Sequence, residues 1–409
     1  MMKIGAILCV TVLTTNAFGQ SMPMIYDTLE TRKQEIVMEG SGELSSTSVS
    51  NSLIQFFVKG GEIPENVRSD NFNQHNDLNR LGVIAQGELS YINYSIQPFE
   101  KKNWGILVKA GTLTTVSSRY RSGLFGMAFL GNEPFLGTTI DLSNSTATYI
   151  GAHKLGFGFI DLKSKSSVNL NVYGITNYAQ GYLNNSSLTQ DAQGYNAEVI
   201  LNGQFEKTSR STYFKGLGVG VDANFILPID AFSKRSYIQF QVQNLGVAFL
   251  SHKVVRYSMD TTIQFNGFEI NDFVGDGAIV NNGTSVFDAI GLKNDTITSD
   301  PIALPFSIQV AKIVDEHSSS LLQSYYGIQA LYQKGAIPMV YAGLQVKPIE
   351  WLRFGASVSY GGFAKFRGGL YAQAVMKKMN LGIATTNIVG MVSKKGFGQA
   401  YSFRINYRI

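Results

Sequence analysis

The chain has 409 residues, of which 44% are hydrophobic, 12% aromatic and only 15% charged, and its formal net charge is +5. Soluble domains carry about 25% charged residues, so this composition is too poor in charge for an ordinary water-exposed surface. The positive charge is not gathered into a basic run, which excludes the usual pattern of a nucleic-acid-binding protein. Cys9 is the only cysteine, so a mature chain without its N-terminus would have no disulfide, thiolate metal site or cysteine nucleophile.

Residues 1–19 have the pattern of a secretory signal peptide. Lys3 supplies a positive charge, residues 4–13 form a short apolar core, and Ala17 and Gly19 offer the small side chains of a cleavage site. The core is shorter than the about 20 residues that a transmembrane helix needs. We therefore expect export, with Gln20 as the first residue of the mature protein.

Apolar and polar residues alternate in many segments after residue 80, most clearly in residues 401–409. The side chains of a strand point alternately to its two faces, so each such segment has one apolar and one polar face. Segments of about 9 to 14 residues suit tilted strands that cross a hydrocarbon core better than the strands of a soluble sandwich. The expected strands are 82–97, 104–117, 148–160, 167–178, 195–206, 214–226, 236–247, 304–314, 325–334, 338–347, 351–360, 367–376, 380–389 and 397–409.

These segments predict an all-β fold, namely an antiparallel transmembrane β-barrel of about 14 strands, with about 12 to 16 allowed. Its lumen is expected to be polar and its lipid-facing wall apolar. The chain also ends on a strand, in the manner of the C-terminal signal by which outer-membrane barrels are recognised for insertion. The residues of this signal are Phe403, Ile405, Tyr407 and Ile409, the last in place of the more usual phenylalanine.

Two stretches are less regular than the strands. The N-terminal segment 20–80 is weakly periodic and is expected to form an extra strand near residues 53–58, a lumen plug or a periplasmic extension, before a barrel over 81–409. The long connection 248–303 contains an expected hairpin over residues 254–270. Connections of this length are usually functional or disordered. If the C-terminus lies in the periplasm, strand parity places this connection outside the cell.

Charged and aromatic residues of the last strands are the candidates for functional positions. Arg353, Arg404 and Arg408 fall on the polar face, which is expected to line the lumen. Lumenal arginines either select anions or pair with acidic residues that keep a barrel closed, and the sequence leaves both roles open. The candidates for an aromatic belt at the membrane interface are Trp351, Tyr401 and Tyr407.

The sequence contains no pattern typical of catalysis, metal binding or cofactor binding. The four histidines, His75, His153, His252 and His317, are scattered, and none belongs to a zinc-binding His-Glu-x-x-His pattern. His153 can pair with a serine as in barrel phospholipases, although a structural role is more common. Residues 271–282 are rich in Asp and Asn but lack the ligand spacing of a calcium loop. We expect no enzyme, no metal and no cofactor.

Short motifs are spread over residues 50–409. They are Phe56-Phe57-Val58-Lys59-Gly60-Gly61-Glu62-Ile63, Asn79-Arg80-Leu81-Gly82, Val242-Gln243-Asn244-Leu245-Gly246-Val247, Phe265-Asn266-Gly267-Phe268-Glu269, Ala303-Leu304-Pro305-Phe306, and Lys347-Pro348 with Trp351-Leu352-Arg353. Together they resemble an uncharacterised family of Bacteroidota outer-membrane β-barrels, related to the fatty-acid-transporter (FadL-like) and porin superfamily. This family has no agreed activity, so the resemblance implies a barrel in the outer membrane of a Gram-negative bacterium but no substrate.

The leading functional hypothesis is a FadL-like transporter or porin for a small solute, apolar or not, because about fourteen strands leave room inside a barrel. The alternative is a non-enzymatic barrel scaffold or accessory subunit of an outer-membrane secretion or assembly machine, which the long connection favours. An outer-membrane hydrolase comes third. The expected partners are outer-membrane lipid, the barrel-assembly machinery during insertion and, for a scaffold, secretion or assembly subunits; nucleic acid is not expected.

Overall fold

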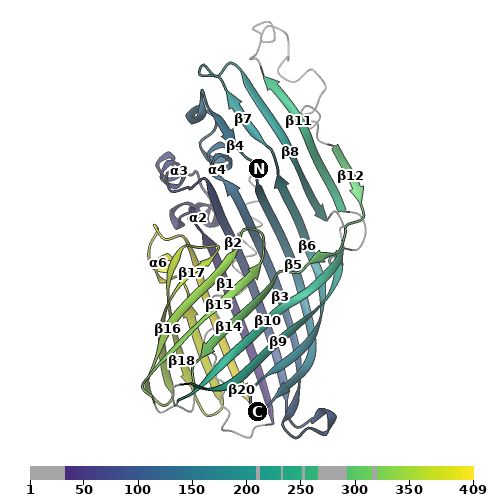
Figure 1. Cartoon of the computed structure of the whole chain (residues 1–409), viewed down its shortest axis with the longest axis vertical. Coiled ribbons are helices and arrows are strands. Elements are labelled where there is room, and N and C mark those ends of the chain that lie inside the picture. Colours follow the sequence, from purple (N-terminus) through teal and green to yellow (C-terminus); the bar gives the residue numbers. More distant parts are fainter. Residues whose placement is uncertain (1–32, 209–211, 232–233, 251–253, 266–292, 316–319) are drawn as a thin grey trace.

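The computed structural model describes residues 33–208, 212–231, 234–250, 254–265, 293–315 and 320–409 (Figure 1). In this part of the chain twenty strands form one sheet, and fourteen of them close into an antiparallel ring. The ring follows chain order from β1 through β2, β3, β5, β6, β9, β10 and β14 to β20, and β20 pairs back onto β1. Closure leaves the ring without an open edge and confirms the predicted fold class.

The ring is taller on one side than on the other, as Figure 1 shows. The strand β3 has 18 residues and β18 has 10, whereas about 9 to 11 suffice to cross a bilayer. The ring strands are β1 (Gln34–Ser46), β2 (Leu78–Asn93), β3 (Trp104–Arg121), β5 (Ser145–Asp161), β6 (Ser167–Leu183), β9 (Gly216–Ala231), β10 (Lys234–Leu250), β14 (Phe306–Ile313), β15 (Leu322–Tyr332), β16 (Ile337–Ile349), β17 (Leu352–Gly362), β18 (Phe366–Val375), β19 (Met379–Thr385) and β20 (Gly398–Arg408).

The strand β1 was not expected from the sequence, and it starts the barrel at Gln34 rather than at residue 81. It pairs with β20 from Glu35–Arg408 to Ser45–Gly398, so it closes the ring. Its inner face carries three glutamates, so the alternation of apolar and polar residues is less clear in this strand than in the other strands of the ring. In the closed barrel each glutamate faces a cation of another segment, so the charges are compensated. The pairs are Glu35–Lys165 at 3.5 Å, Glu39–Arg404 at 2.5 Å and Glu43–Arg367 at 2.6 Å.

A sheet extension rises above the tall side of the ring (Figure 1). It consists of β4 (Thr139–Asp141), β7 (Ser187–Gln190), β8 (Ala197–Thr208), β11 (Val254–Phe265) and β12 (Lys293–Ile297), and the two-residue β13 (Ile302–Ala303) pairs with β10 below it. The upper end of β6 pairs with β8, which pairs with β7 and β11. The expected strand 195–206 therefore exists but lies outside the ring, and β1 takes its place among the fourteen.

The described strands of the long connection, β11 and β12, lie at the end of the barrel opposite the C-terminus (Figure 1). The hairpin expected over residues 254–270 is wrong. The strand β11 runs without a turn from Val254, opposite Thr208, to Phe265, opposite Ala197. Polar residues near its centre stay in the strand because their backbone groups pair with β8. The rest of the expected hairpin, residues 266–270, lies outside the described residues, as does the expected signal peptide.

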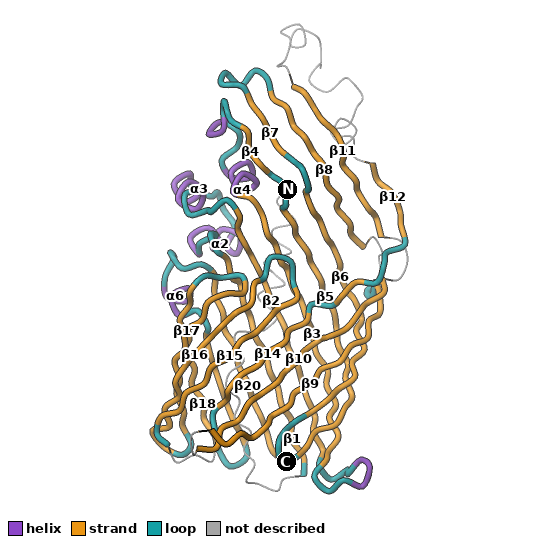
Figure 2. The backbone as a smooth tube through the Cα atoms, viewed as in Figure 1, coloured by secondary structure: helices purple, strands orange, loops and turns teal. Residues whose placement is uncertain are grey.

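Short helices gather at the upper end of the ring (Figure 2). The helix α2 (Asn51–Lys59) replaces the expected strand near residues 53–58, because its apolar residues recur with helical spacing and Leu53 is fully buried. No helix in the described ranges is long and apolar enough to span a membrane. The other helices at this end are α3 (Glu65–Phe72), α4 (Ser122–Phe129), α6 (Ile388–Val392) and the short turn η2 (Glu133–Phe135), whereas the short turn η1 (Pro98–Glu100) lies at the lower end.

Candidate functional site

The two faces of the ring differ in polarity as the alternation predicts. On β16 and β17 the outward side chains Leu344, Phe354 and Val358 are about half exposed, whereas the inward Gln345 and Arg353 are buried. Backbone groups of a closed barrel are paired within the sheet, so such a ring can stand in lipid with its apolar face outward. The lumen is therefore the polar compartment in which a functional site is to be sought.

The three predicted lumenal arginines are buried on the inner wall. Arg353, Arg404 and Arg408 are 5%, 8% and 3% exposed. Arg404 Nη1 pairs with Glu39 Oε1 at 2.5 Å, and Glu39 belongs to the barrel wall. The contact joins two neighbouring strands of the wall, and anion selection and pairing with acidic plug residues both stay predictions.

The predicted belt and insertion residues point the other way. Trp351, Tyr401 and Tyr407 are 51%, 39% and 45% exposed. Tyr407 and Ile405 lie opposite Ile36 and Met38, two exposed apolar residues of β1. Their orientation suits a lipid-facing wall, while their roles as an interface belt and as an insertion signal, together with those of Phe403 and Ile409, stay predictions.

Four buried charges form a network on the inner wall that the sequence analysis did not identify. Lys154 Nζ lies 2.6 Å from Glu88 Oε2 and 3.0 Å from Asp222 Oδ2. Lys109 Nζ lies 2.8 Å from Glu88 Oε1 and 3.9 Å from Asp222 Oδ2. Two cations thus compensate two anions, which is what burial of charge requires. Each residue sits at an inward position of an alternating strand, and this parity was the available clue.

A bulge in β10 connects this network to the centre of the lumen. The pairing of β10 with β9 shifts register between Val242 and Leu245, and Asn244 adopts a positive φ of 57°. Asparagine tolerates this conformation better than most residues. The Asn244 N–H donates to Asp222 Oδ1 at 2.7 Å, and its Oδ1 accepts from the Tyr173 hydroxyl at 3.0 Å. The bulge therefore holds the Asn244 amide at the edge of the charge network.

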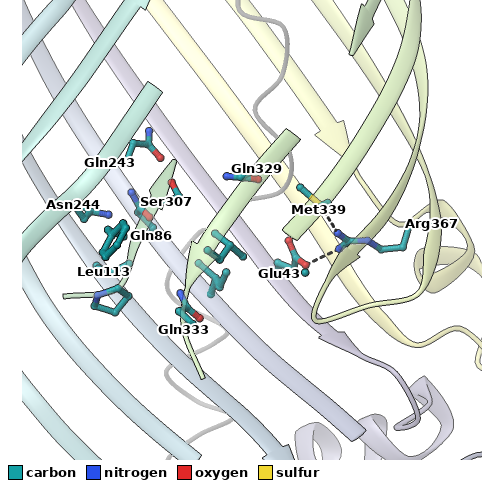
Figure 3. Close-up of a pocket in the computed structure, with 15 residues that line it drawn as sticks. Glu43, Gln86, Leu113, Gln243, Asn244, Ser307, Gln329, Gln333, Met339 and Arg367 are labelled. Carbon is teal, nitrogen blue, oxygen red and sulfur yellow. Dashed lines mark hydrogen bonds and ion pairs between the residues drawn. The ribbon is translucent and has the colours of Figure 1, made fainter. Parts of the chain in front are cut away.

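The lumen contains a chamber of about 60 Å³ beside this bulge (Figure 3). Its lining comes from β1, β2 and β3 on one side and from β10 and β14 to β18 on the other, so the chamber lies between opposite walls of the ring. The lining residues are Glu43, Ile84, Gln86, Leu113, Gln243, Asn244, Pro305, Phe306, Ser307, Gln329, Leu331, Gln333, Met339, Gly362 and Arg367.

One ion pair stands in the chamber wall. Arg367 Nη1 donates to Glu43 Oε1 at 2.6 Å and to Ser45 Oγ at 3.1 Å, while Nη2 contacts Met339 Sδ at 3.1 Å (Figure 3). Glu43 belongs to β1 and Arg367 to β18, with two strands between them in the ring. The pair holds these walls together and cancels its own charge.

Two turns fold inward over the chamber and form its roof. The turn after β15 brings Gly335 to β3, where a Cβ on Gly335 would lie 3.0 Å from Ser118 O and 3.1 Å from Arg119 Cβ. The turn after β17 brings Phe363, which is 1% exposed, against β2. A Cβ on Gly82 would lie only 2.1 Å from Phe363 Cδ2, so only glycine lets the ring pack there.

A cap of helices packs beside the roof. Leu53 of α2 and Phe125 of α4 are buried in one apolar cluster with Tyr120. His75 Nδ1 lies 2.7 Å from Asn71 O, and Nε2 lies 3.1 Å from the Tyr120 hydroxyl. A carbonyl can only accept, so Nδ1 carries the proton and Nε2 of the neutral ring accepts from Tyr120. Burial lowers the pKa of His75 below its usual value and keeps the ring neutral.

Below the chamber, tyrosines lie flat along the inner wall. Tyr371 and Tyr325 are buried, with ring centroids 6.0 Å apart. A Cβ on Gly355 would come within 2.0 Å of the Tyr371 ring, and one on Gly343 within 2.4 Å of the Tyr325 ring. The glycines thus leave room for each ring against the neighbouring strand. The Tyr371 hydroxyl donates to Gln345 Oε1 at 2.8 Å, which continues the amide-rich lining of the chamber downward.

The closed ring, its apolar outer wall and its polar lumen define an outer-membrane β-barrel. The chain belongs to a family of unknown function, DUF5723, whose model matches residues 151–386. This agrees with the expected resemblance to an uncharacterised barrel family. No curated protein sequence matches the chain.

Several solved barrels are similar to this chain at low identity. The toluene transporter TodX of Pseudomonas putida shares 10% identity at a TM-score of 0.36, over 96% of this chain and 95% of that one. The toluene transporter TbuX of Ralstonia pickettii shares 10% identity at 0.41, over 97% and 96%. The translocator domain of the autotransporter NalP from Neisseria meningitidis shares 7% identity at 0.32, over 93% and 90%. Likenesses this low assign no function.

Proposed function

We propose that this barrel binds a small solute in its lumenal chamber and passes it across the outer membrane of a Gram-negative, Bacteroidota-type bacterium, to which an N-terminal signal peptide directs it. The observation that carries the proposal is a chamber between opposite walls of the ring, roofed by two inward turns. A barrel that serves only as a scaffold needs no such chamber.

The roof has to move for a solute to pass. One water needs about 10–15 Å³ of such space, so a chamber of about 60 Å³ holds only a few waters while the roof is closed. The roof turns rest on β2 and β3 through Phe363, the backbone at Gly335 and a hydrogen bond of 3.4 Å that Arg80 Nη2 donates to Ala364 O. A turn held by such local contacts can open without unfolding of the ring, which suits a gate.

A disulfide across the mouth tests the role of the roof. The single natural cysteine, Cys9, falls in the expected signal peptide, so the pair Arg119→Cys with Gly335→Cys would be the only thiols in the mature chain. The two Cβ atoms would lie about 3.1 Å apart, close to the range of about 3.5–4.5 Å that a disulfide spans. We expect the oxidised protein in liposomes to lose solute flux and to regain it under reductant. The single-cysteine variants should keep their flux in both conditions.

Opening the roof is the complementary test. Phe363→Ala removes the ring that lies against Gly82, and we expect conductance in planar bilayers to rise severalfold. Phe366→Ala is the matched control, because Phe366 is 69% exposed and lies outside the chamber. Unchanged flux through the cross-linked barrel, together with unchanged conductance of Phe363→Ala, would contradict the proposal.

The scaffold alternative rests on the sheet extension. The strands β8 and β11 pair over twelve residues above the ring, and their side chains offer a surface to a second protein. If the barrel conducts nothing and purifies from gently solubilised membranes in a stoichiometric complex with secretion or assembly subunits, the scaffold function replaces transport.

A further inference from the structure

Amide side chains dominate the polar lining of the chamber. Gln86, Gln243 and Gln329 project toward its interior from β2, β10 and β15, and Gln333 projects from the turn after β15 (Figure 3). Within the described ranges, no protein group hydrogen-bonds the side-chain amides of the first three. The Oε1 atom of Gln333 is shielded from solvent and also has no partner among the described residues. The chamber therefore presents unpaired donors and acceptors to whatever occupies it.

The lining carries no net charge. Glu43 and Arg367 are its charged members, and they neutralise each other at 2.6 Å. An ion or a zwitterion that entered would lose hydration without meeting a free counter-charge, which is unfavourable. The chamber is thus better suited to uncharged solutes than to anions, cations or amino acids.

Hydrocarbons do not fit this lining either. An apolar solute would displace water from the glutamine amides and leave their donors and acceptors unsatisfied. A site built to hydrogen-bond its ligand rejects an analogue that lacks the matching groups far more strongly than a hydrophobic site rejects an extra hydroxyl. The lining therefore favours a solute with several hydroxyl groups over the apolar solute that the sequence resemblance allowed.

Apolar surface lies beside the amides. The aliphatic side chains of Ile84, Leu113 and Leu331 belong to the same lining. A pyranose ring combines hydroxyl edges with faces of C–H groups. Those faces can pack on the aliphatic side chains while the hydroxyls bond to amides.

We infer that the solute of this chamber is a small uncharged saccharide. Glutamine amides both donate and accept, as sugar hydroxyls do, and the absence of net charge in the lining excludes charged sugar derivatives. This inference rests on the proposed transport function and adds the class of the solute to it.

Liposome flux with solutes of similar size tests the inference. The solutes are glucose as the neutral sugar, gluconate as the anion, glucosamine as the cation and toluene as the hydrocarbon. They are compared in the full-length wild type and in Phe363→Ala, which opens the roof. We expect the barrel to raise the entry of glucose over that into protein-free liposomes more than the entry of any other solute, and we expect glucose to protect the chamber against labelling in Ser307→Cys.

The variant Gln243→Leu with Gln329→Leu removes two of the unpaired amides at nearly constant volume. We expect it to slow glucose flux about tenfold, corresponding to one or two lost hydrogen bonds, and to leave toluene flux unchanged or faster. The matched control is Gln264→Leu, because Gln264 lies on β11 of the extension, far from the chamber lining.

The outcomes separate the two proposals. If no solute crosses even through Phe363→Ala, the transport function fails and the inference with it. If solutes cross but gluconate or toluene matches glucose, or the double leucine variant keeps its glucose flux, transport stands and the saccharide class is overturned.

Discussion

Replacing Lys154 with methionine should destabilise the barrel, because it removes one of the four buried charges of the inner wall. The ammonium group lies 2.6 Å from Glu88 Oε2 and 3.0 Å from Asp222 Oδ2. Methionine is a linear side chain that fills irregular space, but it has no charge and no donor. Glu88 keeps Lys109 at 2.8 Å, whereas Asp222 is left with Lys109 at 3.9 Å.

The expected loss of stability follows from this geometry. Removing one partner of a buried ion pair costs about 3–5 kcal/mol, because the other charge stays buried without compensation. Here the lower end applies, about 3 kcal/mol, since Lys109 still neutralises Glu88 and the Asn244 N–H still donates to Asp222 Oδ1 at 2.7 Å. The double variant Lys154→Met with Asp222→Asn restores neutrality and is expected to recover at least about 1 kcal/mol of that loss.

Urea unfolding in detergent micelles measures these differences, with the fluorescence of Trp104 and Trp351 and the gel mobility of unheated protein as readouts. Lys377→Met, in the exposed turn between β18 and β19, is the control and should change the free energy of unfolding by no more than about 0.5 kcal/mol. A Lys154→Met barrel as stable as this control would refute the reasoning. So would a double variant less stable than Lys154→Met alone.

Two further predictions concern a glycine of the wall and the pH response of the cap. A Cβ on Gly158 would lie 2.1 Å from the carbonyl oxygen of Val168, so Gly158→Ala should lower the free energy of unfolding by about 1–3 kcal/mol. Gly87→Ala is the control and should leave the free energy of unfolding unchanged, because the nearest atoms to its Cβ would lie at 3.9 Å. Equal urea midpoints of the two variants would contradict this prediction. Burial, with a smaller contribution from Lys365, lowers the pKa of His75 below its usual 6.5, so the unfolded cap binds a proton at a pH where the folded cap does not. The contribution of neutral His75 to the stability of the cap is therefore full above about pH 6.5 and is lost as the pH falls below it. Hydrogen exchange of α3, corrected for its intrinsic pH dependence, should become faster in acid for the wild type but not for His75→Phe.

The alternation of apolar and polar residues was enough to predict most of the ring. A lipid-facing strand must bear apolar side chains on one face, so the sequence of each strand shows the alternation by itself. Thirteen of the fourteen expected strands lie in the ring, and Arg353, Arg404 and Arg408 are buried in it.

The exceptions depended on neighbours that are distant in sequence. The inner face of β1 is charged, and only the closed barrel shows that Glu43 meets Arg367, 324 residues further along the chain. The strand β8 has the same alternation as its neighbours, yet it lies outside the ring because it pairs with the upper end of β6 and with β11.

The sequence by itself thus determined the class of fold, the polar lumen and the apolar wall, because strand periodicity is a local property. The chamber, its roof and the charge network were decided by tertiary structure alone. They arise where side chains from different strands come into contact, as when Phe363 packs on Gly82. Ring closure and strand register determine which residues form these contacts. No single strand carries that information, since an unpaired charge or a glycine acquires its role only from the residue placed against it.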